Sequence, residues 1–142
     1  MKIFFETIHL SSKDRIDIID ITNYIETIVT NNNVRDGYAL IFVPGSTGAL
    51  TTIEYESGVL NDLKKAIERI VPDDIPYEHD LRWGDGNGFS HVRAALLGPS
   101  LNIPIKSGKL LRGTWQQIVF IDFDNRPRER EIIVQILGEV KK

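Results

Sequence analysis

The sequence contains no cysteine among its 142 residues. This absence excludes disulfide bonds, thiolate zinc sites and cysteine nucleophiles, so any metal must be bound by histidine, carboxylate or carbonyl oxygen. Methionine is almost absent as well, with a single residue. Together with abundant isoleucine and glutamate, these scarcities favour a thermophilic source.

An excess of basic residues and a long hydrophobic run are also missing. The chain has 17 Lys and Arg against 20 Asp and Glu, a net charge of -3, which provides no basic surface for a nucleic acid. No apolar run approaches the roughly 18 residues of a membrane-spanning helix. The N-terminal "MKIFFETIHL" does not have the architecture of a signal peptide. We therefore expect no nucleic-acid partner, no membrane partner and a cytoplasmic location.

The apolar patterning predicts one α+β domain over residues 1–142. Full helices are expected at 20–32 and 57–72, with Asp20 and Ser57 as candidate N-caps, and a short third helix at 90–97. This mixture predicts a mainly antiparallel β-sandwich, of jelly-roll or barrel type, with two to three helices. The first two expected strands form a hairpin. The expected strands are 4–12, 15–20, 37–45, 50–56, 101–105, 109–111, 114–124 and 130–140.

The stretch "YEHDLRWGDGNGFSHVRAALLG" holds two of the three histidines, His79 and His91. Two neutral imidazoles can supply two ligands of a zinc-type ion, which usually needs a third protein ligand. Asp80 and Asp85 are candidates for further ligands or for partners that orient an imidazole. Asn87 or Ser90 is a candidate cap for the helix that follows. The histidine spacing matches no recognised zinc signature, so a solvated polar turn remains the commoner interpretation from spacing alone.

A second polar turn, "GSTG", follows a short apolar run and precedes "ALTTIEYE". The hydroxyls of Ser46 and Thr47 and the free backbone N–H groups suit a phosphate or carboxylate. The order of residues is that of neither a P-loop nor a nucleophile elbow. A plain strand-to-strand turn explains the pattern equally well. Glu54 is a candidate acid/base group or ligand if it faces inward, although a solvent-facing carboxylate is the commoner outcome in a strand.

Three other features are interpreted as structural. Trp115 in "GTWQQIVFIDFD" is expected in the core or at an interface, as is usual for tryptophan. The stretch "RPRERE" at 126–131 is expected to be a turn of mixed charge. His9 stands alone at the end of the first expected strand.

Taken together, these motifs resemble those of the YjbQ family. The resemblance rests on "STGALTTIEYE", "YEHD", "DGNGFSHVRAALLGPSLNIPIKSGKLLRGTWQQIVFIDFD" and "REREIIVQILG", which occur in the family's order. The family is named for a secondary thiamine-phosphate synthase activity. The resemblance implies an antiparallel β-sandwich that assembles as a homotrimer. It also implies a polar cleft near the subunit seam, with histidines that can hold a divalent metal, most often zinc.

The family pattern has three histidines, and the chain departs from it at one of them. His79 and His91 match the second and third, whereas the first falls on Gly45. Two imidazoles make a weaker metal site than three unless a carboxylate substitutes. The resemblance makes Glu54 and Asp85 the candidates for that role and for catalysis, because Glu54 matches the glutamate that closes the family's first motif.

The activity implied by the resemblance joins a pyrimidine diphosphate to a thiazole phosphate and releases pyrophosphate. Such a site must hold anionic groups of a small phosphorylated metabolite. One alternative is a metal-assisted hydrolase of a small phosphate or carboxylate substrate. The other is a non-catalytic trimeric protein that binds a metabolite or a metal, which the missing histidine favours. The candidate substrate-binding residues are Ser46, Thr47, Arg82, Asn87 and Arg93.

Overall fold

A computed structural model describes residues 1–13 and 15–142 of the chain. Its elements follow in the order β1 (Lys2–Ser12), β2 (Asp17–Asp20), α1 (Thr22–Asn31), β3 (Val34–Phe42), β4 (Gly48–Ile53), α2 (Ser57–Ile70), α3 (Glu78–Trp83), α4 (Gly88–Leu97), β5 (Ser100–Lys106), β6 (Lys109–Leu110), β7 (Gln117–Asp122) and β8 (Arg128–Val140).

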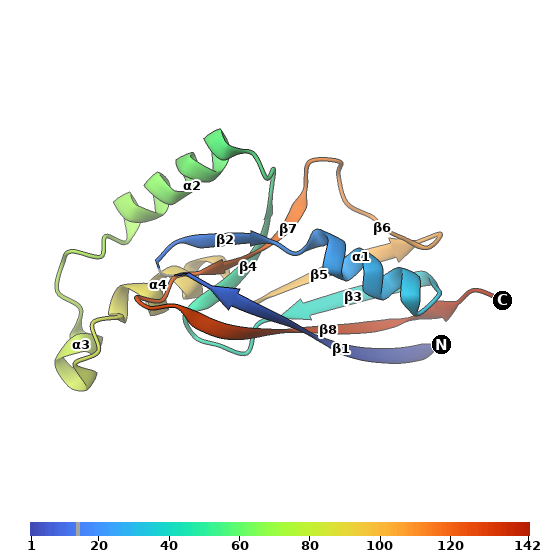
Figure 1. Cartoon of the computed structure of the whole chain (residues 1–142), viewed down its shortest axis with the longest axis horizontal. Helices are drawn as coiled ribbons and strands as arrows, with labels where there is room; N and C mark the ends of the chain where they lie inside the picture. Colours follow the sequence, from blue (N-terminus) through green and yellow to red (C-terminus); the bar gives the residue numbers. More distant parts are fainter. Residues whose placement is uncertain (14) are drawn as a thin grey trace.

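The strands form two antiparallel sheets (Figure 1). The first has five strands in the order β1-β8-β3-β5-β6, and the second has three in the order β2-β7-β4. The α+β class and the antiparallel pairing predicted from the sequence are confirmed. Every helix in the described ranges is too short or too polar to cross a bilayer.

The main core lies between the two sheets and is closed on one side by α1. It is rich in β-branched side chains, which pack well on pleated surfaces. Along β8 the buried positions alternate, with Ile132, Val134 and Ile136 facing inward. The apolar stripe of α1 adds Ile25 and Val29 to the same core. This alternation fixes the register, because a shift by one residue would expose the whole buried set.

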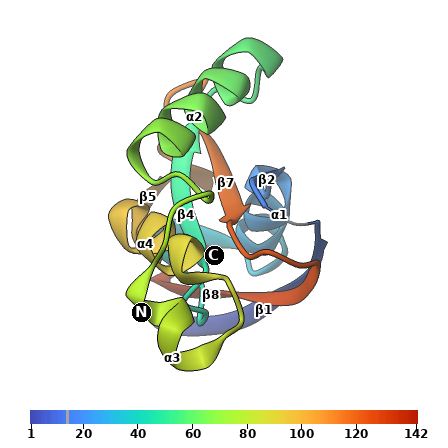
Figure 2. The same cartoon turned by 90° about the vertical axis from the view of Figure 1, so that its left-hand side faces the viewer.

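The three-stranded sheet is covered on its second face as well. Its central strand β7 directs Ile118 and Phe120 into the main core. The alternate residues of the strand, Val119 and Ile121, point to the other face and pack in a second cluster with Ile67 of α2 and Ala94 of α4. β7 is therefore buried on both faces, which explains its continuous apolar run. This second layer of helices carries the segment with the two histidines (Figure 2).

The structure corrects four details of the sequence-based prediction. β1 and β2 do not form a hairpin: β1 pairs with β8 and β2 pairs with β7. Both faces of β2 are packed, because Ile18 belongs to the second cluster and Ile19 packs against the main core. α3 is an additional helix of only six residues, too short for a clear apolar periodicity, and Trp115 is 67% exposed, which excludes the core and leaves the expected interface as the alternative.

The fourth correction concerns the start of a helix. The side chain that caps α2 is Glu56 rather than Ser57, because its carboxylate accepts hydrogen bonds from the backbone N–H groups of Gly58 and Val59. Two other expected caps differ as well: Ile21 is the N-cap of α1, where Asp20 accepts a hydrogen bond from the backbone N–H of Thr22, and the side chain of Asn87 at the start of α4 makes no capping hydrogen bond.

Candidate functional site

Two short helices bring the histidines together. α3 ends at Gly84, whose φ of 70° lies in the left-handed region that glycine adopts without strain. The chain then returns and begins α4 at Gly88, where a Cβ atom would lie 2.7 Å from Cβ of Tyr77. The absence of a side chain at Gly88 thus lets α3 pack against α4. The ring centroids of His79 and His91 are 4.5 Å apart as a result.

Carboxylates surround the first of these imidazoles. Nδ1 of His79 lies 3.4 Å from Oδ1 of Asp80 and 3.5 Å from Oδ1 of Asp85. Asp80 is also engaged by the start of α4, since its Oδ1 accepts a 2.9 Å hydrogen bond from the N–H of Gly88. This makes Asp80 an orienting partner of His79, and leaves Asp85 as the freer carboxylate.

The surroundings of His91 favour its neutral form. Burial, followed by the electrostatic effect of the neighbouring His79, lowers the pKa of His91 from its ordinary value of 6.5. A neutral imidazole is the form that binds a metal ion or accepts a proton.

A network of acids and arginines forms the opposite wall. It is built by the turn that carries the chain from β7 in one sheet to β8 in the other. Arg130 binds Asp122 through two hydrogen bonds of 2.8 and 2.9 Å, and Asp122 is completely buried. Arg128 donates to Oδ2 of Asp124 at 2.9 Å. Such bidentate and charge-assisted bonds fix both guanidinium groups at the edge of the two sheets.

Thr47 connects this network to the polar turn after β3. Its hydroxyl donates to Oδ2 of Asp124 at 3.0 Å and accepts from Nη2 of Arg130 at 2.7 Å. Its carbonyl accepts a 3.0 Å hydrogen bond from the N–H of Phe123. The "GSTG" turn is therefore part of the site and is fixed by it.

Asp124 is ionised despite its burial. Burial acts to raise the pKa of Asp124, but hydrogen bonds from the Asn125 N–H, Asn87, Thr47 and Arg128 outweigh it and hold the pKa below its ordinary value. Because the amide of Asn87 donates to Asp124, the other end of that side chain faces away from the carboxylate. Its Oδ1 is buried and has no hydrogen-bond partner in the described structure.

Gly45 leaves room for Arg130. A Cβ atom at position 45 would lie 2.9 Å from Nη1 of Arg130. In the described part of the chain, Nε and Nη2 make the hydrogen bonds of this guanidinium, and Nη1 is the nitrogen left free. The space beside the missing side chain is thus taken by an arginine.

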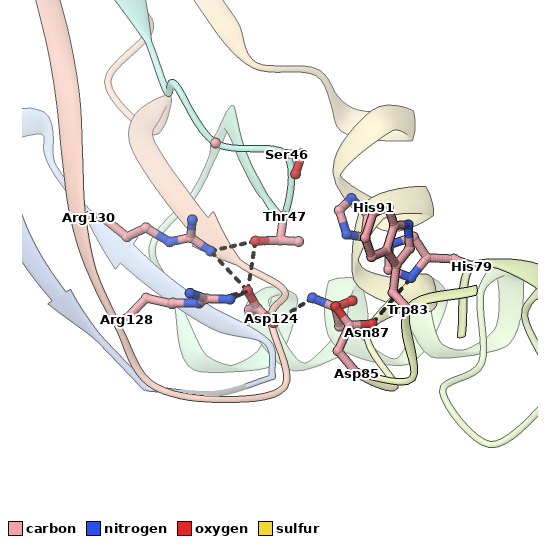
Figure 3. Close-up of a pocket in the computed structure, with 11 residues that line it drawn as sticks. Ser46, Thr47, His79, Trp83, Asp85, Asn87, His91, Asp124, Arg128 and Arg130 are labelled. Carbon is pink, nitrogen blue, oxygen red and sulfur yellow. Dashed lines mark hydrogen bonds and ion pairs between the residues drawn. The ribbon is translucent and has the colours of Figure 1, made fainter. Parts of the chain in front are cut away.

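These segments enclose a pocket of about 460 Å³, a volume ordinary for small-molecule sites (Figure 3). Figure 3 shows the imidazoles and the indole of Trp83 on one side and the arginines on the other. The residues that line it are Gly45, Ser46, Thr47, His79, Trp83, Asp85, Asn87, His91, Asp124, Arg128 and Arg130.

The pocket gathers six of the residues singled out from the sequence: Ser46, Thr47, His79, Asp85, Asn87 and His91. Four others do not line it, of which Asp80 lies behind His79 as described above. Glu54 and Arg82 are exposed. Arg93 is 1% exposed, donates to the carbonyl of Val71 at 2.9 Å and lies over the ring of Phe89. Its position is that of a tether between α4 and the end of α2.

Four lining residues were missed by sequence reasoning: Trp83, Asp124, Arg128 and Arg130. The arginines belong to the stretch interpreted as a turn of mixed charge; both lie at the start of β8. A signal for this wall existed in "IVFIDFD", where Asp122 and Asp124 interrupt an apolar run at alternate positions. Acids in a strand buried on both faces need buried partners, and Arg126, Arg128 and Arg130 follow directly in the sequence.

The residues of the pocket fit a divalent cation. The group that offers nitrogen and oxygen donors together consists of His79, Asp80 and Asp85, whose ligand atoms all lie within 4.8 Å of one another, and the ring of His91 lies beside it. The carboxylates of Asp80, Asp85, Asp122 and Asp124 outnumber the two guanidinium groups by two, which a divalent cation would balance. The unpartnered Oδ1 of Asn87 lies among the same groups.

Comparison with known proteins identifies the family. Residues 6–139 match the family described as "UPF0047 protein YjbQ-like". A UPF0047 protein of Archaeoglobus fulgidus is 43% identical over 90% of this chain and 97% of its own length. The UPF0047 protein YugU of Bacillus subtilis is 32% identical over 94% and 98%.

Solved structures agree with the sequence relatives. A YbjQ-like protein of unknown function from Sulfolobus solfataricus P2 superposes with a TM-score of 0.92 at 36% identity, covering 97% of this chain and 99% of that one. The match thus extends over strands, helices and pocket segments alike. The chain belongs to the YjbQ-like UPF0047 family.

Proposed function

We propose that the pocket binds a phosphate-bearing small molecule together with a divalent cation and promotes departure of a phosphate group from it. The observation that carries the proposal is that metal-binding side chains and arginines face each other across one cavity. On one side lie paired imidazoles with Asp85, and on the other lie Arg128 and Arg130. A cation and a guanidinium on either side of a phosphate group stabilise the negative charge that it carries as it departs.

We assign a role to each residue from the donor and acceptor atoms that its contacts leave available. His79, His91 and Asp85 would hold the cation, for which zinc is the best fit, and Asp80 would orient His79. The free Nη1 of Arg130 and the hydroxyl of Ser46 would bind phosphate oxygens. When bound, the cation would supply positive charge to the departing phosphate group.

The specific reaction we propose is a thiamine-phosphate synthase-like transfer. A pyrimidine diphosphate would lose pyrophosphate as the nitrogen of a thiazole phosphate forms the new carbon–nitrogen bond. This reaction depends on binding the anionic groups and aligning the two substrates, and less on a general base. The arginines of the pocket provide the anion binding. Hydrolysis of a phosphate ester is the second candidate; in that reaction His91 would accept a proton from water instead of binding the cation, and its lowered pKa favours the required neutral form.

The test compares the wild-type protein with a His79→Ala, His91→Ala double variant. We expect product from the two phosphorylated precursors, loss of that product with a chelator, and a fall in activity on the order of 100-fold or more in the double variant. The zinc content of the double variant should fall below that of the wild-type protein, in parallel with its activity. Glu54→Gln is the matched control, because Glu54 is exposed and lies outside the pocket lining.

The same assays separate the alternatives. Release of inorganic phosphate from generic esters, without coupled product, would replace the synthase by a hydrolase. Ligand-dependent thermal stabilisation with no turnover in either assay would replace both by a metabolite-binding protein. Full activity in the double variant would contradict the role of the imidazoles.

We further propose that copies of this chain associate through the outer face of the five-stranded sheet, as a homotrimer. This face consists of Ile3, Phe5, Tyr38, Leu40 and Phe42, with Ile133 and Leu137 between them. Its first five residues are 37–66% exposed although they are large and apolar. The register places them in adjacent rows, since Leu137 pairs with both Ile3 and Tyr38. A contiguous apolar surface of this kind marks an interface in most soluble proteins.

A further inference from the structure

Trp83 is the anomalous member of the pocket lining. Apart from Trp83 and Gly45, every lining residue carries a polar or charged side chain. The indole is 67% exposed, so it contributes little to the core. None of the six residues of α3 is buried, and the helix does not use Trp83 as an anchor. A large apolar ring at the edge of a polar cavity is therefore available to a ligand.

The indole is also held in place from its own helix. The guanidinium of Arg82 lies over the ring, 5.6 Å from its centroid. A cation–π contact of this kind restrains the ring and leaves the rest of its surface open. Figure 3 shows the indole beside the two imidazoles, across the cavity from the arginines that would bind a phosphate.

We propose that Trp83 is the ring-binding residue of this pocket and selects phosphate-bearing ligands that carry a planar aromatic ring over phosphates without one. This rests on the proposed function and deepens it. Stacking is the interaction that an exposed indole offers, and it accepts many rings because each has a π-face. A ligand made only of phosphate and hydroxyl groups would satisfy the polar wall and leave the indole exposed to water.

The chain provides its own control for this assignment. It has two tryptophans. Trp115 is 67% exposed, the same fraction as Trp83, but it does not line the pocket. A Trp115→Phe background therefore isolates the fluorescence of Trp83, and Trp115→Ala reports the effect of removing an exposed indole elsewhere.

The experiment titrates zinc-loaded protein with cytidine 5′-monophosphate and with ribose 5-phosphate, by calorimetry and by Trp83 fluorescence. We expect the ring-bearing phosphate to bind about tenfold more tightly and to quench Trp83. Trp83→Ala should abolish this preference while leaving the affinity for ribose 5-phosphate unchanged. Trp83→Phe should retain most of the preference, and Trp115→Ala should retain all of it.

The outcomes distinguish this inference from the function on which it rests. Equal binding of the two phosphates, or an equal loss of both in Trp83→Ala, would overturn the role of Trp83 and leave the phosphate site intact. Failure of both phosphates to bind the wild-type protein would overturn the proposed function and the inference with it. A Trp83→Ala variant that kept its ring preference but changed its oligomeric mass would assign the indole to a subunit contact instead.

Discussion

At the scale of the residue, the chemistry of the site depends on the protonation of His91. Its imidazole lies next to a second imidazole and within a partly buried cavity. Both conditions oppose a positive charge, because burial removes water and a charged neighbour repels. His91 therefore favours the neutral form, in which one ring nitrogen has a lone pair that can bind a metal ion or accept a proton.

The expected consequence is a pH dependence with a definite sign. Because the pKa of His91 is lowered in the folded protein, its contribution to stability is present above its ordinary value of 6.5 and is lost as the pH falls through the lowered value. NMR titration of the metal-free protein should therefore show His91 protonating below pH 6.5. In a His79→Ala variant the midpoint should rise, since one of the two causes is removed. A midpoint at or above the ordinary value in the wild-type protein would contradict this account.

At the scale of the element, the pocket depends on how the turn after β3 fits against β8. The turn approaches so closely that position 45 has no room for a side chain beside Arg130. Arg130 cannot easily move away, because Asp122 and Thr47 hold two of its nitrogens. The free nitrogen is therefore positioned by two segments that are distant in sequence.

A Gly45→Ala variant should weaken phosphate binding by roughly tenfold, because the added methyl group displaces the nitrogen that donates to the anion. Calorimetric titration with inorganic phosphate measures the effect. Combining it with Arg130→Lys provides the control. The shorter ammonium group does not meet the methyl, so Gly45→Ala should add little in that background. Independent, additive losses would show that Gly45 does not act through Arg130.

The same elements show how far the sequence predicts this site. The two histidines and the "GSTG" turn could be identified because their residue types suggest chemistry by themselves. For Arg128 and Arg130 the only signal was the pair of acids in "IVFIDFD", because their position in the site depends on how β7 and β8 are placed in different sheets. The expected β1–β2 hairpin failed for the same reason. Local patterns specify strands well, whereas the partner of each strand is set by long-range burial.

At the scale of the whole molecule, the outer face of the five-stranded sheet is an apolar surface that no other part of the described chain covers. Its other face is packed in the main core, so the sheet is stable as a layer and still presents large apolar side chains. Exposure of such a surface in a monomer would favour aggregation.

A Phe5→Lys variant should therefore prevent the proposed association, because a lysine within this apolar face must be desolvated when copies associate. Light scattering at micromolar concentration measures the mass of both proteins. Tyr24→Lys is the matched control, since Tyr24 is 50% exposed but belongs to α1, which packs on the other side of the sheet. A monomeric wild-type protein would contradict the proposed assembly directly.

The arginine network has one more consequence, for how this protein tolerates mutation. Ser12 on β1 donates to Asp122, Asp122 holds Arg130 of β8, and Arg130 reaches Thr47 ahead of β4. These side chains fasten one sheet to the other while they shape the pocket. A substitution in this network should therefore disturb the contact between the sheets as well as the pocket, and the effects of two such substitutions should not be additive.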